Sequence, residues 1–221
     1  MSHGSAIQSF RETLQRDRVV GILRGAPDAS LPAVAEAVRR AGLTFLEVTL
    51  NTPGACEQIR VLSKLLDGSC QIGAGTVLDP TSASEAVDAG AKFLVSPGFF
   101  PALQSWANDR SIPTLPGALT PTEIWNAWSA GAALVKVFPA RTAGGPGYFK
   151  ELRGPFGQVG LLACGGVCAD NAAEYIRSGA NALAFGGSIF AATRLRDLEV
   201  EAMATDIQTL LQAARNPPPK D

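Results

Sequence analysis

The chain has 221 residues, of which 46% are hydrophobic and 18% are charged. This length suits one large domain, and the hydrophobic fraction is enough to bury a substantial core, which excludes a small stapled module and a disordered chain. Nineteen basic and twenty acidic residues leave a formal charge of -1. Neither a nucleic acid nor a membrane surface is therefore expected as a partner.

The single histidine is His3, and we expect residues 1–5, which contain it, to be a flexible start. One histidine in that position argues against a histidine-based triad or a multi-histidine metal site, and no metal or other cofactor is expected. The four cysteines form no CxxC pair, and the sequence contains neither a signal peptide nor an apolar run of eighteen residues. A reduced, cytoplasmic setting without disulfides is predicted.

Short apolar runs recur along the chain, each followed by a stretch of helical character, which is typical of a parallel α/β sheet. Strands are predicted over 19–24, 45–50, 71–76, 93–96, 114–117, 134–138, 161–165 and 182–185, with a last helix from about 198 to 214. Eight such units indicate a (β/α)8 TIM barrel with an additional N-terminal helix, because doubly wound sheets usually have about five or six strands. We expect a single domain over residues 1–221 with a proline-rich tail at 216–221.

One predicted strand contains a lysine. Lys136 interrupts an otherwise apolar run, and strand alternation puts it on the same face as Leu134 and Phe138. A lysine that apolar walls desolvate loses preference for its charged form, and the free amine attacks carbonyl groups to form a Schiff base. The structural alternative is a lysine paired with a buried carboxylate.

Glu47 interrupts a second predicted strand, Phe45 to Leu50, in the same way. An amine and a carboxylate that meet inside a barrel supply the nucleophile and the proton carrier that imine formation and carbon–carbon cleavage require. A purely structural ion pair between Glu47 and Lys136 predicts the same placement. The residues alone leave both interpretations open.

Gly-Gly turns follow the seventh and eighth predicted strands, at Gly165-Gly166 and at Gly186-Gly187-Ser188. Barrels often bind phosphate at these two places, because backbone N–H groups and a helix N-terminus converge there. One Gly-Gly turn alone would mean little, since glycines are common in such loops. The pair of turns predicts a phosphate site.

Two further polar residues lie at predicted strand ends. Arg24 follows the first strand, where a guanidinium binds a carboxylate through two hydrogen bonds, although a surface or inter-subunit ion pair would explain it equally well. Thr76 ends the run Gly73-Ala74-Gly75-Thr76 and offers a hydroxyl beside a glycine-rich backbone, where a lone threonine is more often structural. The rest of a dinucleotide fingerprint is missing from this run.

Six segments in unbroken order now make a recognisable set. They are Leu46-Glu47-Val48-Thr49-Leu50, Gly73-Ala74-Gly75-Thr76-Val77, Ser96-Pro97-Gly98, Leu115-Pro116-Gly117, Val135-Lys136-Val137-Phe138-Pro139-Ala140 and Gly186-Gly187-Ser188. In combination the chain resembles the KDPG/KHG aldolase family from about Val19 to Ala192. Those enzymes cleave 2-keto-3-deoxy-6-phosphogluconate or 4-hydroxy-2-oxoglutarate through a lysine Schiff base. The resemblance implies a phosphorylated keto-acid substrate and a homotrimer.

The resemblance also implies roles for individual residues. Lys136 matches the Schiff-base lysine, and Glu47 matches the acid that moves protons between water, the imine and the C4 hydroxyl. Thr76 is expected to touch the pyruvate carboxylate, and Pro97 and Phe138 to line the pocket around the pyruvyl carbons. The residues expected to bind the phosphate are Gly165, Gly166, Gly187 and Ser188.

The chain departs from the family's pattern at one position that matters for binding. Many members carry an arginine two residues after Thr-Leu on the second strand, whereas this chain has Asn51 there. Aldolases for the galactonate epimer resemble this chain, with Leu-Arg ending the first strand and Leu-Asn-(Ser/Thr)-Pro after the second. Arg24 would then supply the missing charge. Cys164 stands where gluconate-type members often have Thr and galactonate-type members have Val, so the epimer preference stays open.

Two other hypotheses place a different function on the same barrel. A phosphosugar isomerase or epimerase would use Glu47 as a base and Lys136 only for electrostatics. A phosphate-ligand binding protein would keep the two residues as a structural pair. Both must treat the match of the lysine strand and its neighbours as coincidence.

Overall fold

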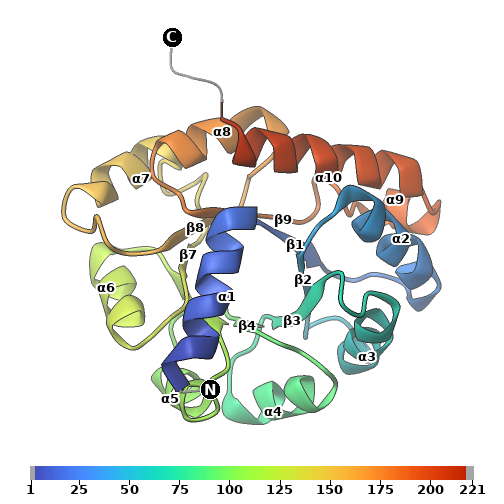
Figure 1. Cartoon of the computed structure of the whole chain (residues 1–221), viewed down its shortest axis with the longest axis horizontal. Coiled ribbons are helices and arrows are strands. Elements are labelled where there is room, and N and C mark those ends of the chain that lie inside the picture. Colours follow the sequence, from blue (N-terminus) through green and yellow to red (C-terminus); the bar gives the residue numbers. More distant parts are fainter. Residues whose placement is uncertain (1–2, 218–221) are drawn as a thin grey trace.

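Parallel strands alternate with helices and form a ring in the computed structural model, which describes residues 3–217 (Figure 1). The strands are β1 (Val19–Leu23), β2 (Phe45–Thr49), β3 (Gln71–Gly75), β4 (Leu94–Val95), β5 (Thr114–Leu115), β6 (Gly117–Ala118), β7 (Val135–Val137), β8 (Leu161–Cys164) and β9 (Ala182–Phe185). Their order is β5-β4-β3-β2-β1-β9-β8-β7-β6, and each strand runs parallel to its neighbours in this order. The predicted TIM barrel with an N-terminal helix is confirmed.

The fifth predicted strand is divided in two, and the ring closes through this division. β5 pairs with β4 and β6 pairs with β7, while Pro116 lies between the two short strands. The prediction of one continuous strand over 114–117 was wrong at Pro116, because proline has no N–H to donate to a ladder. Its carbonyl still accepts a hydrogen bond of 2.8 Å from the Lys136 amide, which joins the two edges.

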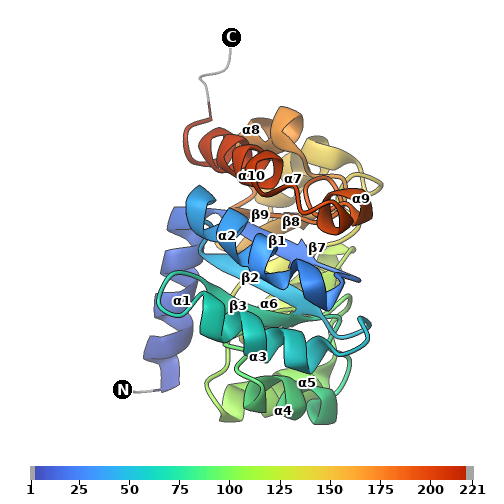
Figure 2. The same ribbon diagram turned by 90° about the vertical axis from the view of Figure 1, so that its right-hand side faces the viewer.

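The helices form the outer layer of the molecule (Figures 1 and 2). They are α1 (His3–Asp17), α2 (Leu31–Ala41), α3 (Ala55–Leu65), α4 (Pro80–Asp88), α5 (Pro101–Asp109), α6 (Pro121–Ser129), α7 (Gly145–Arg153), α8 (Ala169–Arg177), α9 (Ala192–Arg196) and α10 (Val200–Arg215), with a 3-10 turn at Asp28–Ser30. α1 thus includes three residues of the expected flexible start, and Met1 and Ser2 lie outside the described residues. The last helix ends at Arg215, before the proline-rich tail, whose residues 218–221 are also outside.

The ends of several helices follow from local chemistry. α4, α5 and α6 each have proline in the first turn, where a missing N–H costs no hydrogen bond. The Asp79 carboxylate accepts hydrogen bonds from the first amides of α4, and Thr120 and Glu123 form a capping box at α6. α2 is followed by Gly42, whose φ of 70° is the left-handed conformation that glycine adopts without strain.

The helix α1 covers the end of the barrel where the strands begin. The centre of its Phe10 ring lies 5.2 Å from the ring centre of Phe45 and 5.3 Å from that of Phe93. Leu14 is fully buried in the same cluster. The Arg11 guanidinium donates hydrogen bonds to the carbonyls of Ala132 and Ala133. Apolar side chains therefore fill the lower barrel interior, and polar chemistry is left to the other end.

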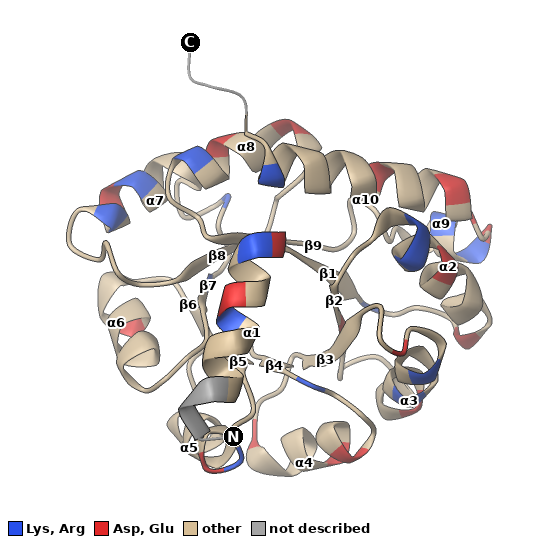
Figure 3. Ribbon diagram, in the orientation of Figure 1, with Lys and Arg blue, Asp and Glu red and all other residues tan. Residues whose placement is uncertain are grey.

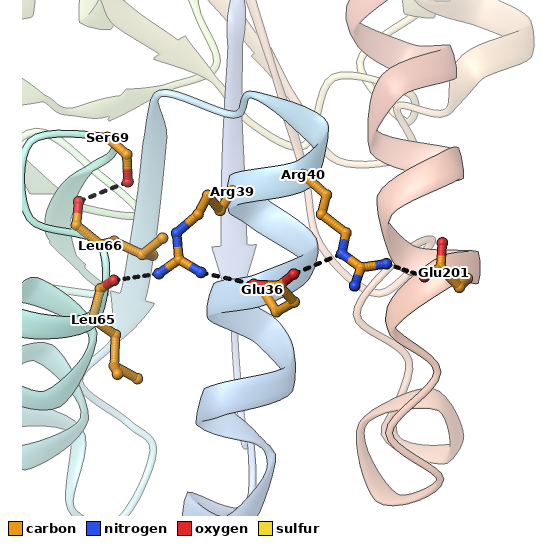
Figure 4. A network of polar contacts seen from close by, with 7 residues as sticks. All are labelled: Glu36, Arg39, Arg40, Leu65, Leu66, Ser69 and Glu201. Atoms are coloured by element: carbon orange, nitrogen blue, oxygen red, sulfur yellow. Dashed lines mark hydrogen bonds and ion pairs between the residues drawn. The ribbon is translucent and has the colours of Figure 1, made fainter.

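Charged residues gather on the helices, and the strands are almost free of them (Figure 3). Glu36 on α2 pairs with Arg39 and Arg40; Arg39 also donates to the Leu65 carbonyl of α3, and Arg40 pairs with Glu201 of α10 (Figure 4). Such exposed pairs join neighbouring helices but contribute little to stability. Among the described residues, no helix is long and apolar enough to cross a membrane.

Candidate active site

Two charged side chains, each from the middle residue of its strand, lie on the inner face of the barrel on β2 and β7. Glu47 is 2% exposed and Lys136 is 7% exposed, each within a strand whose other residues are buried. Alternation along the strand places Phe45 below Glu47 and Leu134 below Lys136, both within the apolar interior. The ammonium nitrogen of Lys136 lies 5.2 Å from the centre of the Phe138 ring.

Burial controls the protonation of Glu47. It raises the pKa of this carboxyl above its ordinary value, and the positive charges of Lys136 and Arg24 oppose the rise. The net direction is upward, since removing the carboxylate from water is the largest effect. A carboxyl group in this setting exchanges a proton more readily near neutral pH than an exposed glutamate does, which suits a proton carrier.

Gly75 provides the space that Glu47 occupies. A Cβ atom at position 75 would lie 2.6 Å from Oε1 of Glu47, closer than nonbonded atoms approach. A Cβ atom at position 73 would likewise lie 2.5 Å from the Phe93 ring, so Gly73 leaves room for that ring. The GxG run on β3 therefore has a steric role that its sequence pattern did not indicate.

A cavity of about 290 Å³ opens at the carboxyl ends of the strands, above Lys136. It is lined by nine of the ten residues that the sequence predicted for the site: Arg24, Thr76, Pro97, Lys136, Phe138, Gly165, Gly166, Gly187 and Ser188. Glu47 is not part of the lining and lies buried below it. No group of three or more His, Cys, Asp or Glu side chains able to hold a metal occurs in the part of the chain described.

The backbone at the cavity takes conformations that are costly elsewhere. Thr76 has a φ of 58°, which a β-branched residue rarely adopts. Gly165 and Gly166 have φ values of 98° and 79°, so both are in the region that favours glycine. The strained backbone of Thr76 at the cavity is of a kind that clusters at binding and catalytic sites, whereas the two glycines adopt their conformations without strain.

Arg24 reaches across to the neighbouring strand end. One of its terminal nitrogens donates a hydrogen bond of 3.1 Å to Oδ1 of Asn51. The next amide, that of Gly25, donates to the Thr52 hydroxyl at 2.8 Å, and this hydroxyl lies 3.3 Å from that of Thr49. The loop after β2 therefore holds both the side chain of Arg24 and the backbone beside it.

Cys164, which stands where other family members have Thr or Val, also lines the cavity. Its side chain is buried, and burial raises the pKa of the thiol to about 11 against the opposing effect of the Lys136 charge. The thiol is therefore protonated at neutral pH and presents an almost apolar surface next to the lysine. Its place at the end of a predicted strand was the sequence feature that could have indicated a cavity-lining position.

Solved structures share this architecture. The KDPG aldolase from Legionella pneumophila, solved with pyruvate captured as a covalent carbinolamine, matches with a TM-score of 0.82 and 26% identity over 95% of this chain and 98% of that chain. A structure described as native KDPGal matches with a TM-score of 0.81 and 30% identity, covering 89% and 94% of the two chains. The molecule is accordingly an α/β barrel of the aldolase type.

Sequence relatives define the family. A model of the family described as KDPG and KHG aldolase matches residues 10–205. The 2-dehydro-3-deoxy-phosphogluconate aldolase of Pseudomonas aeruginosa is 38% identical over 80% of each chain, and a probable 2-dehydro-3-deoxy-6-phosphogalactonate aldolase of Rhizobium meliloti is 34% identical over 78% of this chain and 81% of that protein. The chain belongs to the KDPG and KHG aldolase family and is a class I aldolase, a carbon–carbon lyase.

Proposed function

We propose that the protein cleaves 2-keto-3-deoxy-6-phosphogluconate to pyruvate and glyceraldehyde 3-phosphate through a Schiff base on Lys136, and that it also cleaves 4-hydroxy-2-oxoglutarate to pyruvate and glyoxylate. The observation that carries this proposal is the position of Lys136, buried in a strand at the floor of the cavity with the buried carboxyl of Glu47 nearby. An amine in such a place meets a substrate carbonyl away from bulk water.

The reaction needs one nucleophile and one proton carrier. The Lys136 amine attacks the C2 ketone, and loss of water from the carbinolamine leaves an iminium. Glu47, through a water molecule, takes the proton of the C4 hydroxyl, and the C3–C4 electron pair moves into the iminium as the aldehyde leaves. The enamine is then protonated at C3, and water releases pyruvate and the free lysine.

The lining residues suggest how the substrate lies. The carboxylate next to C2 is assigned to Arg24 and Thr76, and the pyruvyl carbons to the apolar surfaces of Pro97 and Phe138. The phosphate is assigned to the glycine turns, where Gly165, Gly166, Gly187 and Ser188 line the same cavity. Backbone N–H groups in such turns bind anions without a charged side chain.

The alternative substrate is the galactonate epimer, 2-keto-3-deoxy-6-phosphogalactonate. The contact between Arg24 and Asn51 favours it, since it matches the first-strand arginine and second-strand asparagine that resemble the galactonate type. The two epimers differ at C4, so the same lysine chemistry serves both. A direct comparison of their kcat/KM values decides between them.

We also propose that the protein is a homotrimer in the cytoplasm. The exposed apolar side chains of Leu119 and Trp125 support an association surface, and the four free thiols fit a reducing compartment. Light scattering of the purified protein is expected to give three times the mass of 23.0 kDa. A monomer mass at micromolar concentration would contradict the trimer.

Turnover tests the proposed function. The protein is incubated with each of the three keto acids, and pyruvate is measured through lactate dehydrogenase and NADH. Cleavage of at least one of them, with pyruvate and aldehyde in equal amounts, is the expected result. No cleavage of any of them, together with isomerisation of a phosphosugar or its tight binding without turnover, would favour one of the other two hypotheses.

A further inference from the structure

Arg141 is fixed beside the glycine turn at the end of β8. The amide of Ala140 donates a hydrogen bond of 2.7 Å to the Cys164 carbonyl, and the amide of Arg141 donates one of 3.0 Å to the Gly165 carbonyl. These two bonds join the segment after β7 to the last residue of β8 and to the first residue of the turn that follows it. The backbone at 141 therefore cannot move independently of the turn.

The missing side chain of Gly166 leaves room for the stem of Arg141. A Cβ atom at position 166 would lie 2.7 Å from both Cβ and Cδ of Arg141, so the methylene groups lie across the α-carbon of this cavity-lining glycine. Gly166 also has a left-handed φ of 79°. Arg141 and the turn thus pack against each other at the rim of the cavity.

The charged end of Arg141 is exposed and makes no hydrogen bond or ion pair with any other residue in the described part of the chain. Arg153, by contrast, donates to carbonyl groups such as that of Gly179, and Arg194 pairs with Asp206. The charge of Arg141 acts on the hydroxyl of Tyr175 in α8, where it opposes the effect of burial on the pKa of that group. Within the described residues Arg141 is thus an unpaired cation whose stem packs on the cavity-lining Gly166, and Arg141 itself is not among the residues that line the cavity.

We propose that Arg141 determines the preference of the enzyme for phosphorylated substrates by binding the phosphate with its guanidinium. This proposal rests on the proposed function and adds a side-chain cation to a site otherwise formed by backbone groups, Ser188 and glycines. Guanidinium–phosphate hydrogen bonds are charge-assisted and are stronger than those of neutral donors. Because the stem is already packed on Gly166, less side-chain freedom is lost on binding.

The test compares substrates with and without the phosphate. Arg141→Met keeps a long apolar stem on Gly166 and removes the charge, and Arg141→Lys restores a cation. The ratio of kcat/KM for 2-keto-3-deoxy-6-phosphogluconate to that for unphosphorylated 2-keto-3-deoxygluconate is expected to fall about tenfold in Arg141→Met and to recover in part in Arg141→Lys. An unchanged ratio, or an equal loss on both substrates, would overturn the proposal.

A matched control and a binding measurement separate this proposal from the proposed function. Arg110→Ala removes an exposed arginine that stacks on Trp106, on α5, and is expected to leave the ratio unchanged. Calorimetric titration with inorganic phosphate requires no turnover, and its Kd is expected to rise about tenfold in Arg141→Met. Equal phosphate affinity in the wild type and Arg141→Met would refute the role of Arg141 even if the keto acids are cleaved. If the wild type cleaves none of the keto acids but Arg141→Met binds phosphate more weakly, only the proposed function would be refuted.

Discussion

Arg24 donates a hydrogen bond of 3.1 Å to Asn51 and thereby places its guanidinium at the cavity, beside the residue that stands where many family members carry an arginine. The two strands involved are neighbours in the sheet. A cation just after β1 and an amide just after β2 are thus hydrogen-bonded to each other, with the cation lining the cavity. The site keeps one positive charge near the expected carboxylate despite the departure in sequence.

This relationship predicts that the positive charge of the site can be moved from position 24 to position 51. Arg24→Ala is expected to raise the KM for the keto acid about tenfold or more, because a charge-assisted contact to the carboxylate is lost. Adding Asn51→Arg to that variant is expected to recover part of the loss by supplying a guanidinium from the second strand. Steady-state kinetics of both variants checks the exchange, and a double variant no better than Arg24→Ala would argue against it.

The proton carrier is tested by Glu47→Gln, which keeps the shape of the side chain but cannot accept a proton. We expect kcat to fall by roughly 10²- to 10⁴-fold, the usual contribution of a general acid–base group. Exchange of the pyruvate methyl protons with deuterated water, followed by NMR, should slow to a similar extent. Glu57→Gln, an exposed residue paired with Arg60, is the control and should match the wild type. Unimpaired methyl exchange in Glu47→Gln would remove this residue from the mechanism.

The raised pKa of Glu47 predicts a pH dependence of stability with a definite sign. A carboxyl whose pKa is higher in the folded state than in the unfolded chain contributes stability that is present at low pH and is lost as the pH rises through the folded-state value. The ordinary pKa of a glutamate carboxyl is 4.5. We expect the difference in Tm between Glu47→Gln and the wild type to grow in favour of the variant as the pH rises above about 4.5. A difference that is constant from pH 4 to pH 8, or that shifts towards the wild type, would contradict the raised value.

Gly75→Ala tests the steric role of β3. The added Cβ atom would lie 2.6 Å from Oε1 of Glu47, so either the carboxyl or the strand must move. We expect a loss of about 1–3 kcal/mol in unfolding free energy, typical of an overpacked core, together with lower turnover. Gly147→Ala, in α7 with nothing within 4 Å of the new atom, is the matched control and should be neutral or slightly stabilising. Equal stability of the two variants in urea titration would refute the steric role.

Much of the site could be predicted because strand alternation is a simple rule. A lysine and a glutamate inside apolar strands had to face the barrel interior, and the Gly-Gly turns had to lie at the strand ends. The division of the fifth strand was not predicted, although Pro116 lacks the N–H that a continuous ladder requires. The two halves pair with different neighbours, β5 with β4 and β6 with β7, which is a property of the assembled sheet.

Other features depend on residues that are distant in the sequence. The need for Gly75 is set by Glu47 on the next strand, and the stem of Arg141 lies on Gly166. The bond between Arg24 and Asn51 spans 27 positions. The two glycine pairs have no sequence signature, because each arises from the register of neighbouring strands and loops, whereas Arg24 and Asn51 could be connected only because both positions match the galactonate-type pattern.

The most direct test of the central claim is to trap the Schiff base. The protein is incubated with pyruvate and sodium borohydride, and the reduced adduct is located by peptide mass spectrometry. We predict one adduct, on Lys136, with Lys92 and Lys150 unmodified, and no adduct in Lys136→Ala while circular dichroism shows that the variant is folded. An unmodified Lys136 in the folded wild-type protein, or an adduct on a different lysine, would contradict the mechanism.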